Sequence, residues 1–146
     1  MKYQITILLT LFFIGFTPVN INAQKQKIKY DKNSGLVTVD GMSYAFIEKE
    51  NAPGQLGINK NYTILNLDKE PLIYMSFQQE DIYDVYGRKT KEVKSFYEIN
   101  FLSSGKKSRK NGTLTALSAA KIVVRNNLIK DGGIDIDAEE KFHMKY

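Results

Sequence analysis

The chain has 146 residues, with 21 basic side chains against 16 acidic ones and a formal net charge of +5 at pH 7. Its length suits a single domain with one hydrophobic core. The chain contains no cysteine, which excludes disulfides, thiol catalysis and zinc–thiolate sites, so the fold must be stabilised by apolar burial and backbone pairing.

The N-terminus has the three-part order of a secretory signal. Lys2 supplies a positive charge, the segment 5–16 is almost entirely apolar, and the small residue Ala23 precedes the expected cleavage point. The apolar segment is shorter than the ~20 residues of a membrane-spanning helix. Because no cysteine stands at the cut, we expect no lipid anchor. We therefore predict a cleavable signal peptide over residues 1–23 and a single small domain over residues 24–146, periplasmic or secreted.

Strand patterns occupy the first half of the exported chain. A first strand is expected near residues 28–30, and two β-rich runs at 36–39 and 43–47 flank an Asp-Gly dipeptide at 40–41. Asp-Gly between two such runs is a strong signal for a β-hairpin. We predict a hairpin here and then a loop over residues 48–61, where proline and glycine recur.

The next strands are predicted from the alternation of their side chains. Residues 62–67 and 72–77 flank a turn, and the second run is apolar on both faces, which is typical of a central strand. Residues 93–101 alternate most clearly, with one apolar and one polar face, as in a half-buried strand. The segment 78–92 is ambiguous between strand, helix and loop. Residues 103–112 are expected to form a polar, basic loop or a ragged hairpin.

The apolar period then changes to that of a helix. A helix is predicted over residues 113–130, with its first threonine as N-cap and the glycines of 131–133 as its stop. Its apolar stripe contains Leu114, Leu117, Val124 and Leu128. Asp137 resembles the start of a capping box, so a short second helix is predicted over residues 138–145 with Phe142 facing inward.

Strands first and helices last predict the α+β class, as an antiparallel β-meander followed by a C-terminal helix pair packed on the sheet. Two stretches, Val-Thr-Val-Asp-Gly-Met-Ser-Tyr-Ala at 37–45 and Val-Val-Arg-Asn-Asn-Leu-Ile-Lys-Asp-Gly at 123–132, precede an acid-rich short helix that contains Phe142. Together with the signal, they resemble small exported proteins of Gram-negative bacteria whose function is not established. The resemblance implies a bacterial envelope or secreted location, supports the order of strands and helices, and carries over no catalytic residue.

Signatures of catalysis and of metal binding are weak. The single histidine, His143, lies near the end of the chain with no nucleophile beside it in the pattern. The acids of 48–50, 80–84 and 135–140 lie in predicted loops and helix starts, and the last group fails the glycine and glutamate positions of a calcium loop. No glycine-rich phosphate loop and no G-x-S-x-G elbow occurs. We predict no catalytic residue, no metal ligand and no cofactor.

Two groups of residues are candidates for binding. The densest cationic cluster consists of Lys106, Lys107, Arg109 and Lys110. Such a cluster can hold phosphates, acidic glycans or anionic headgroups, and it can equally be a solvated loop. Tyr83 and Tyr86 lie in the ambiguous, mixed-charge segment, and aromatic residues away from a core face are enriched in interfaces.

We therefore predict a non-catalytic binding or interaction domain in the bacterial envelope or outside the cell. Its expected partner is an envelope protein or an anionic glycan, and no nucleic acid is expected for an exported protein. A small secreted hydrolase with paired carboxylates is one alternative. A structural accessory protein of an envelope assembly is another, and it requires an exposed apolar strip beside Leu117, Val124 and Leu128.

Overall fold

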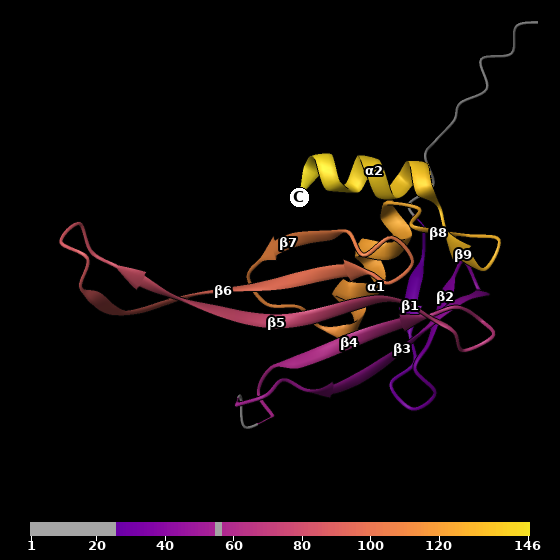
Figure 1. The fold of residues 1–146 in the computed structure, drawn as a ribbon. Helices are drawn as coiled ribbons and strands as arrows, with labels where there is room; N and C mark the ends of the chain where they lie inside the picture. Colours follow the sequence, from indigo (N-terminus) through magenta and orange to yellow (C-terminus); the bar gives the residue numbers. More distant parts are fainter. Residues whose placement is uncertain (1–25, 55–56) are drawn as a thin grey trace, which may run out of the picture.

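A computed structural model describes residues 26–54 and 57–146, and the predicted signal peptide lies outside the described residues. The described chain begins with an antiparallel meander in which every strand pairs with the next one along the chain (Figure 1). The strands of this sheet are β1 (Ile28–Tyr30), β2 (Leu36–Val39), β3 (Met42–Asn51), β4 (Lys60–Leu65), β5 (Pro71–Tyr83), β6 (Lys89–Phe101) and β7 (Lys107–Asn111).

Two helices and a small hairpin complete the chain. They follow in the order α1 (Ala116–Arg125), β8 (Ile129–Lys130), β9 (Gly133–Ile134) and α2 (Ile136–Lys145). Helix α1 crosses one face of the sheet, and α2 runs beside the β7 edge (Figure 1). The predicted α+β class, with a meander followed by a helix pair on the sheet, is confirmed. In the described part of the chain, no helix is both long and apolar enough to cross a membrane.

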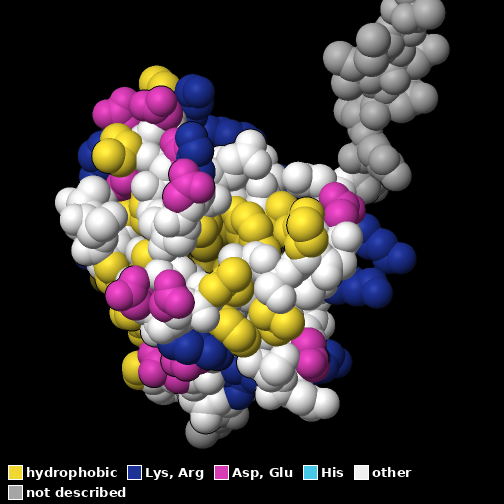
Figure 2. All heavy atoms as spheres, turned by 90° about the vertical axis from the view of Figure 1, so that its right-hand side faces the viewer, with side chains coloured by type: hydrophobic (Ala, Val, Ile, Leu, Met, Phe, Trp, Pro, Cys, Tyr) yellow, Lys and Arg dark blue, Asp and Glu magenta, His cyan; other side chains and the backbone are white. Residues whose placement is uncertain are grey.

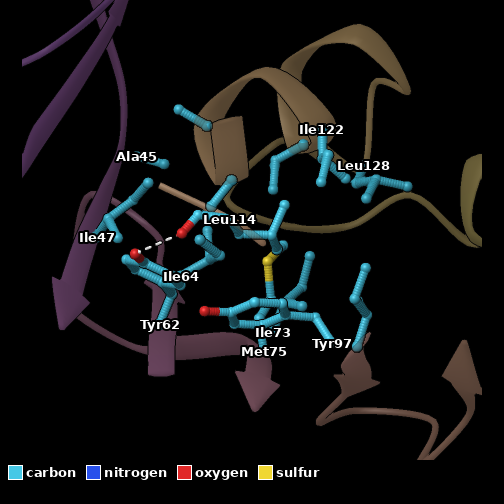
Figure 3. Close-up of a cluster of buried hydrophobic side chains, with 14 of the residues drawn as sticks. Ala45, Ile47, Tyr62, Ile64, Ile73, Met75, Tyr97, Leu114, Ile122 and Leu128 are labelled. Carbon is cyan, nitrogen blue, oxygen red and sulfur yellow. Dashed lines mark hydrogen bonds between the residues drawn. The ribbon is translucent and has the colours of Figure 1, made fainter. Parts of the chain in front are cut away.

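The core lies between the sheet and α1. The inward faces of β5 and β6 are buried, as the alternation predicted: Ile73, Met75, Phe77, Tyr97, Ile99 and Phe101. Helix α1 covers them with Ala119, Ala120, Ile122, Val123 and Val124. Figure 3 shows the strand side chains pointing at Leu114, Ile122 and Leu128. The tight β2–β3 turn is also confirmed, because Asp40 and Gly41 both adopt positive φ angles, at 52° and 89°.

Strands β5 and β6 are longer than predicted. Tyr62 in β4 pairs with Met75, and Asn111 in β7 pairs with Phe96. Beyond these partners, β5 and β6 pair only with each other, and they form a two-stranded projection that we call the arm, residues 78–95 (Figure 1). The ambiguous segment is therefore strand on both sides of a turn. Its pattern is polar because no layer covers it.

The structure corrects one predicted loop and decides between two alternatives for another. The loop predicted over 48–61 is shorter, because β3 continues to Asn51 and β4 begins at Lys60. Of the two alternatives for 103–112, the hairpin is the one found, with β7 pairing along β6.

The first helix is also shorter than predicted. Its N-cap is Thr115, whose hydroxyl accepts a hydrogen bond from the Ser118 amide, so the expectation of Thr113 was wrong. The helix ends at Arg125 because Asn127 adopts a φ of 51°, which a right-handed helix cannot continue. Leu128 is buried from the connection that follows the helix. The Asp131 and Gly132 pair forms the β8–β9 turn and does not terminate the helix.

Helix α2 begins two residues earlier than predicted. Its N-cap is Asp135, whose carboxylate accepts a bond of 2.9 Å from the Ala138 amide. The prediction that Phe142 faces inward is confirmed, since it is 1% exposed and its ring lies edge-on to Phe101 at 5.7 Å. This contact anchors α2 to the β6 side of the core.

Candidate functional site

The predicted cationic cluster divides between the two faces of β7 and the turn before it. Lys107 forms an ion pair with Glu98 at 2.8 Å. Arg109 pairs with Glu80 at 2.9 Å, and its guanidinium lies 4.4 Å from the centre of the Phe96 ring. Three of the four predicted cations therefore have an acidic neighbour already, because Lys106 also lies 3.8 Å from a carboxylate oxygen of Glu140.

Lys110 differs from the other three. Its neighbours along β7 alternate to the opposite face, so Lys110 faces the helices, with its ammonium 5.6 Å from the centre of the Tyr146 ring. There it lines a cleft between β7, α1 and α2 together with Lys121, Arg125 and Lys145. The structure thus separates one member of the predicted cluster and places it among cations from distant parts of the sequence.

This cationic cleft consists of two adjoining hollows of about 450 Å³ each. Both are lined by Arg125, Asn126 and Lys145. The hollow against β7 contains no aspartate or glutamate in its lining, whereas the other adds Lys141 and, at its end, Asp135 and Asp137. Within the described residues, none of the five cations of the cleft takes part in an ion pair.

The helical spacing explains how these cations converge. Lys121 and Arg125 stand at positions i and i+4 of α1, and Lys141 and Lys145 stand at i and i+4 of α2, so each pair shares one helix face. Like charges at this spacing slightly destabilise a helix. The spacing therefore places two cations side by side on the face of each helix that borders the cleft.

The predicted tyrosines lie at the outer end of the arm. Tyr83 is 60% exposed, Tyr86 is 79% exposed, and Val85 between them is 93% exposed. The carboxylate of Asp84 shapes the turn, because it accepts bonds of 2.9 Å from the amides of Tyr86 and Arg88. The result is a well-formed apolar tip at the point of the arm farthest from α1 (Figure 1).

Charged side chains of the arm are largely satisfied within the chain. Lys89 pairs with Asp81 at 2.8 Å, and Arg88 pairs with Asp84 at 3.0 Å. Between residues 80 and 94 the sequence has as many basic side chains as acidic ones. The arm therefore offers little net charge, and its contact chemistry is that of the aromatic and aliphatic tip.

His143 belongs to a polar network beneath α2. Its Nδ1 lies 2.6 Å from the Ser108 hydroxyl, and its Nε2 lies 3.6 Å from a carboxylate oxygen of Glu139, a residue only 3% exposed. The Ser104 hydroxyl donates to the same carboxylate. Although serine, histidine and glutamate meet here, Ser108 is buried and neither it nor His143 lines the cationic cleft. The network joins α2 to the β6–β7 hairpin.

Two of the candidate carboxylates have lowered pKa values. Hydrogen bonds from Tyr74 and Asn61 lower the pKa of Glu50, and the backbone amide of Arg88 leads the contacts that lower the pKa of Asp84. A general acid in hydrolysis needs the opposite shift. Among the described residues, no group of histidine, aspartate and glutamate side chains is arranged to hold a metal ion.

A different surface lies at the end of the molecule opposite the arm. Figure 2 views this end and shows hydrophobic side chains gathered in its centre. A cleft here is lined by Tyr44, Leu67 and Ile129, with Asp68 and Asp131 as its charged residues. Its apolar and acidic lining makes it chemically opposite to the cationic cleft.

Comparison of the chain with protein-family models, with curated proteins and with solved structures gives no match. The site assignment therefore depends on the geometry alone. Our sequence analysis missed four of the five cleft cations. The i, i+4 spacing of Lys121 with Arg125, and of Lys141 with Lys145, is the signal that would have indicated them.

Proposed function

We propose that this chain is an exported, non-catalytic binding domain that uses its arm to hold a protein partner in the bacterial envelope or outside the cell. The observation that carries the proposal is the exposed tip of Tyr83, Val85 and Tyr86, held away from the core by two strands that pair only with each other. Tyrosine supplies large contact area with few rotatable bonds, which suits a recognition surface.

The chemistry of the arm favours a protein over a polyanion or a lipid surface. Its charges balance and are mostly paired internally, so electrostatic attraction to an anionic ligand is weak. The partner that fits is a protein with an apolar pocket able to accept an aromatic side chain. Of the three residues named for an accessory role on α1, Leu117 is exposed, whereas Val124 and Leu128 are buried, so the arm offers the larger exposed apolar surface.

The test places a photo-reactive amino acid at Val85 in exporting cells and, as a matched control, at Met42, which is 72% exposed near the other end of the sheet. We expect one protein to cross-link from position 85 and not from position 42. The purified partner should then bind the Y83S/Y86S variant at least ten-fold more weakly than the unchanged chain. The M42S/L67S variant should bind within two-fold of the unchanged chain.

Two outcomes would refute the proposal. One is cross-linking from position 85 to lipid or glycan only. The other is a partner whose affinity is unaffected by the loss of Tyr83 and Tyr86.

A further inference from the structure

We infer that the cationic cleft between β7, α1 and α2 is a binding site for an acidic oligosaccharide. It lies on the body of the domain, apart from the arm, and it is argued from different residues. The inference therefore does not depend on the protein partner proposed above.

The first step is electrostatic. Lys110, Lys121, Arg125, Lys141 and Lys145 come from three separate elements and line one concave surface. On the opposite face of β7, Lys107 and Arg109 each have an acid within 3 Å. The cleft cations have no such partner, although acids are abundant in the neighbouring turns. A concave surface that concentrates one sign of charge attracts ligands of the opposite sign.

The second step is shape. Each hollow is about 450 Å³, which lies within the usual range for small-molecule sites. Because Arg125, Asn126 and Lys145 line both hollows, they form one elongated, two-part cleft. A ligand with several anionic groups along a short chain can place one group in each hollow, whereas a single phosphate ion would fill only part of one.

The third step is the neutral lining. The hollow against β7 also presents Asn111, Thr113, Ser118 and the ring of Tyr146. Amide and hydroxyl groups can exchange hydrogen bonds with sugar hydroxyls, and an aromatic ring offers an apolar surface for a sugar face. Asp135 and Asp137 at the far end can accept hydrogen bonds from hydroxyls but would repel a further anionic group. The lining therefore fits a hydroxyl-rich chain with a limited number of negative charges.

Two other polyanions fit less well. Single-stranded nucleic acid is usually held by several stacking rings along a groove, and this cleft offers the ring of Tyr146 with Phe142 buried behind it. An anionic lipid surface would meet a protruding basic face more readily than a hollow between two helices. The acidic oligosaccharide is thus the ligand class that uses the charge, the shape and the neutral lining together.

The test is isothermal titration calorimetry of the protein purified after export. The acidic probes are tetragalacturonate and a sulfated heparin tetrasaccharide. Maltotetraose, inorganic phosphate and phosphatidylglycerol vesicles serve as comparisons. We expect at least one acidic tetrasaccharide to bind, more weakly as salt is added. Both K121Q/R125Q and K141Q/K145Q should weaken it at least ten-fold, and circular dichroism should confirm that these variants are folded.

The matched control is K106Q/K107Q, which removes the same charge from the ion-paired cluster and should change binding less than two-fold. The inference is overturned if neither acidic probe binds, if maltotetraose or phosphate binds as tightly, or if only vesicles bind. Equal losses in the control and in the cleft variants would also overturn it, because net charge would then explain the binding. Failure of this test leaves the arm proposal intact, since that proposal uses neither the probes nor these lysines.

Discussion

The phenol of Tyr62 in β4 donates a hydrogen bond of 3.0 Å to the main-chain carbonyl of Leu114, just before α1 (Figure 3). This bond joins the middle of the sheet to the point where the chain leaves β7 for the helix. Both residues are buried, so water cannot replace the bond. Burial raises the pKa of Tyr62 to about 12, and the neighbouring phenols of Tyr97 and Tyr30 add to the shift.

We expect Tyr62→Phe to destabilise the fold by about 1–2 kcal/mol, because it leaves the buried Leu114 carbonyl without this donor. Denaturant unfolding at neutral pH measures the loss. The decrease in the free energy of unfolding at alkaline pH should change too. A tyrosine whose pKa is raised on folding contributes stability that is complete below the unfolded pKa of 10.0 and is lost as the pH rises toward the folded value of about 12. The variant should therefore lose less stability than the unchanged protein over that interval, and an identical alkaline loss would contradict the assignment.

Phe142 is the main apolar anchor of α2. Its replacement by alanine should cost about 3–5 kcal/mol, because the ring is buried against Phe101 and leaves a cavity. The matched control is Met144→Ala on the same helix, where the side chain is 81% exposed and the change should stay within about 0.5 kcal/mol. Chemical denaturation of the two variants compares them directly, and similar losses would show that α2 is not held by this contact.

Asn66 connects two turns that are far apart in the sequence. Its Nδ2 donates to the Gly132 carbonyl at 2.9 Å and to Glu70 at 2.8 Å, while its Oδ1 accepts from the amides of Asp68 and Glu70. Asn66→Ala should cost about 1–3 kcal/mol, since the amides of Asp68 and Glu70 and the carbonyl of Gly132 all lose the partner that the buried Asn66 side chain supplies. Asn66→Asp should cost more at neutral pH, because a carboxylate cannot donate and would face Glu70, and it should recover partly in acid. Thermal unfolding at two pH values tests this, and equal behaviour of the two variants would be evidence against the proposed bonds.

Asp84 should make the tip of the arm sensitive to acid. Its pKa lies below the ordinary value of 3.8, chiefly because of the Arg88 backbone amide, so the order that it confers is present above that value and is lost as the pH falls through the lowered pKa. In an NMR titration the amide signals of Tyr86 and Arg88 should therefore move with a midpoint below 3.8. Asp84→Asn, which keeps an oxygen acceptor without the charge, should abolish the titration. A midpoint at or above 3.8 would count against the turn described here.

Local chemistry explains which parts of the fold could be predicted. Asp40 and Gly41 prescribe a turn from their own conformational preferences, and the inward residues of β5 and β6 alternate because one side meets α1. The arm gave no such signal, because neither face of residues 78–95 is covered by another layer. Its strands are maintained by pairing with each other, which a single-sequence pattern does not record.

The cleft could be predicted only in part, for a similar reason. The two i, i+4 pairs of cations are visible within each helix, but their approach to Lys110 depends on how α1 and α2 pack on the sheet. The density of basic residues in the sequence favoured Lys106 and Lys107. In the structure, Lys107 pairs with Glu98 of the neighbouring strand, and Lys106 lies near Glu140 of α2. The end of α1 was misplaced because Leu128 continues the apolar spacing of the helix, although it reaches the core from the next connection.

The exposed tip of the arm and the buried core of the body use different residues, whereas in many domains the same strands must supply both. Residues 78–95 contribute no side chain to the buried core, so amides in the arm should exchange hydrogen with solvent much faster than those of the central sheet. Mutations at the tip can accumulate without a penalty in folding. The sheet, the helices and the cleft of the body should therefore keep their stability whatever side chains the tip carries.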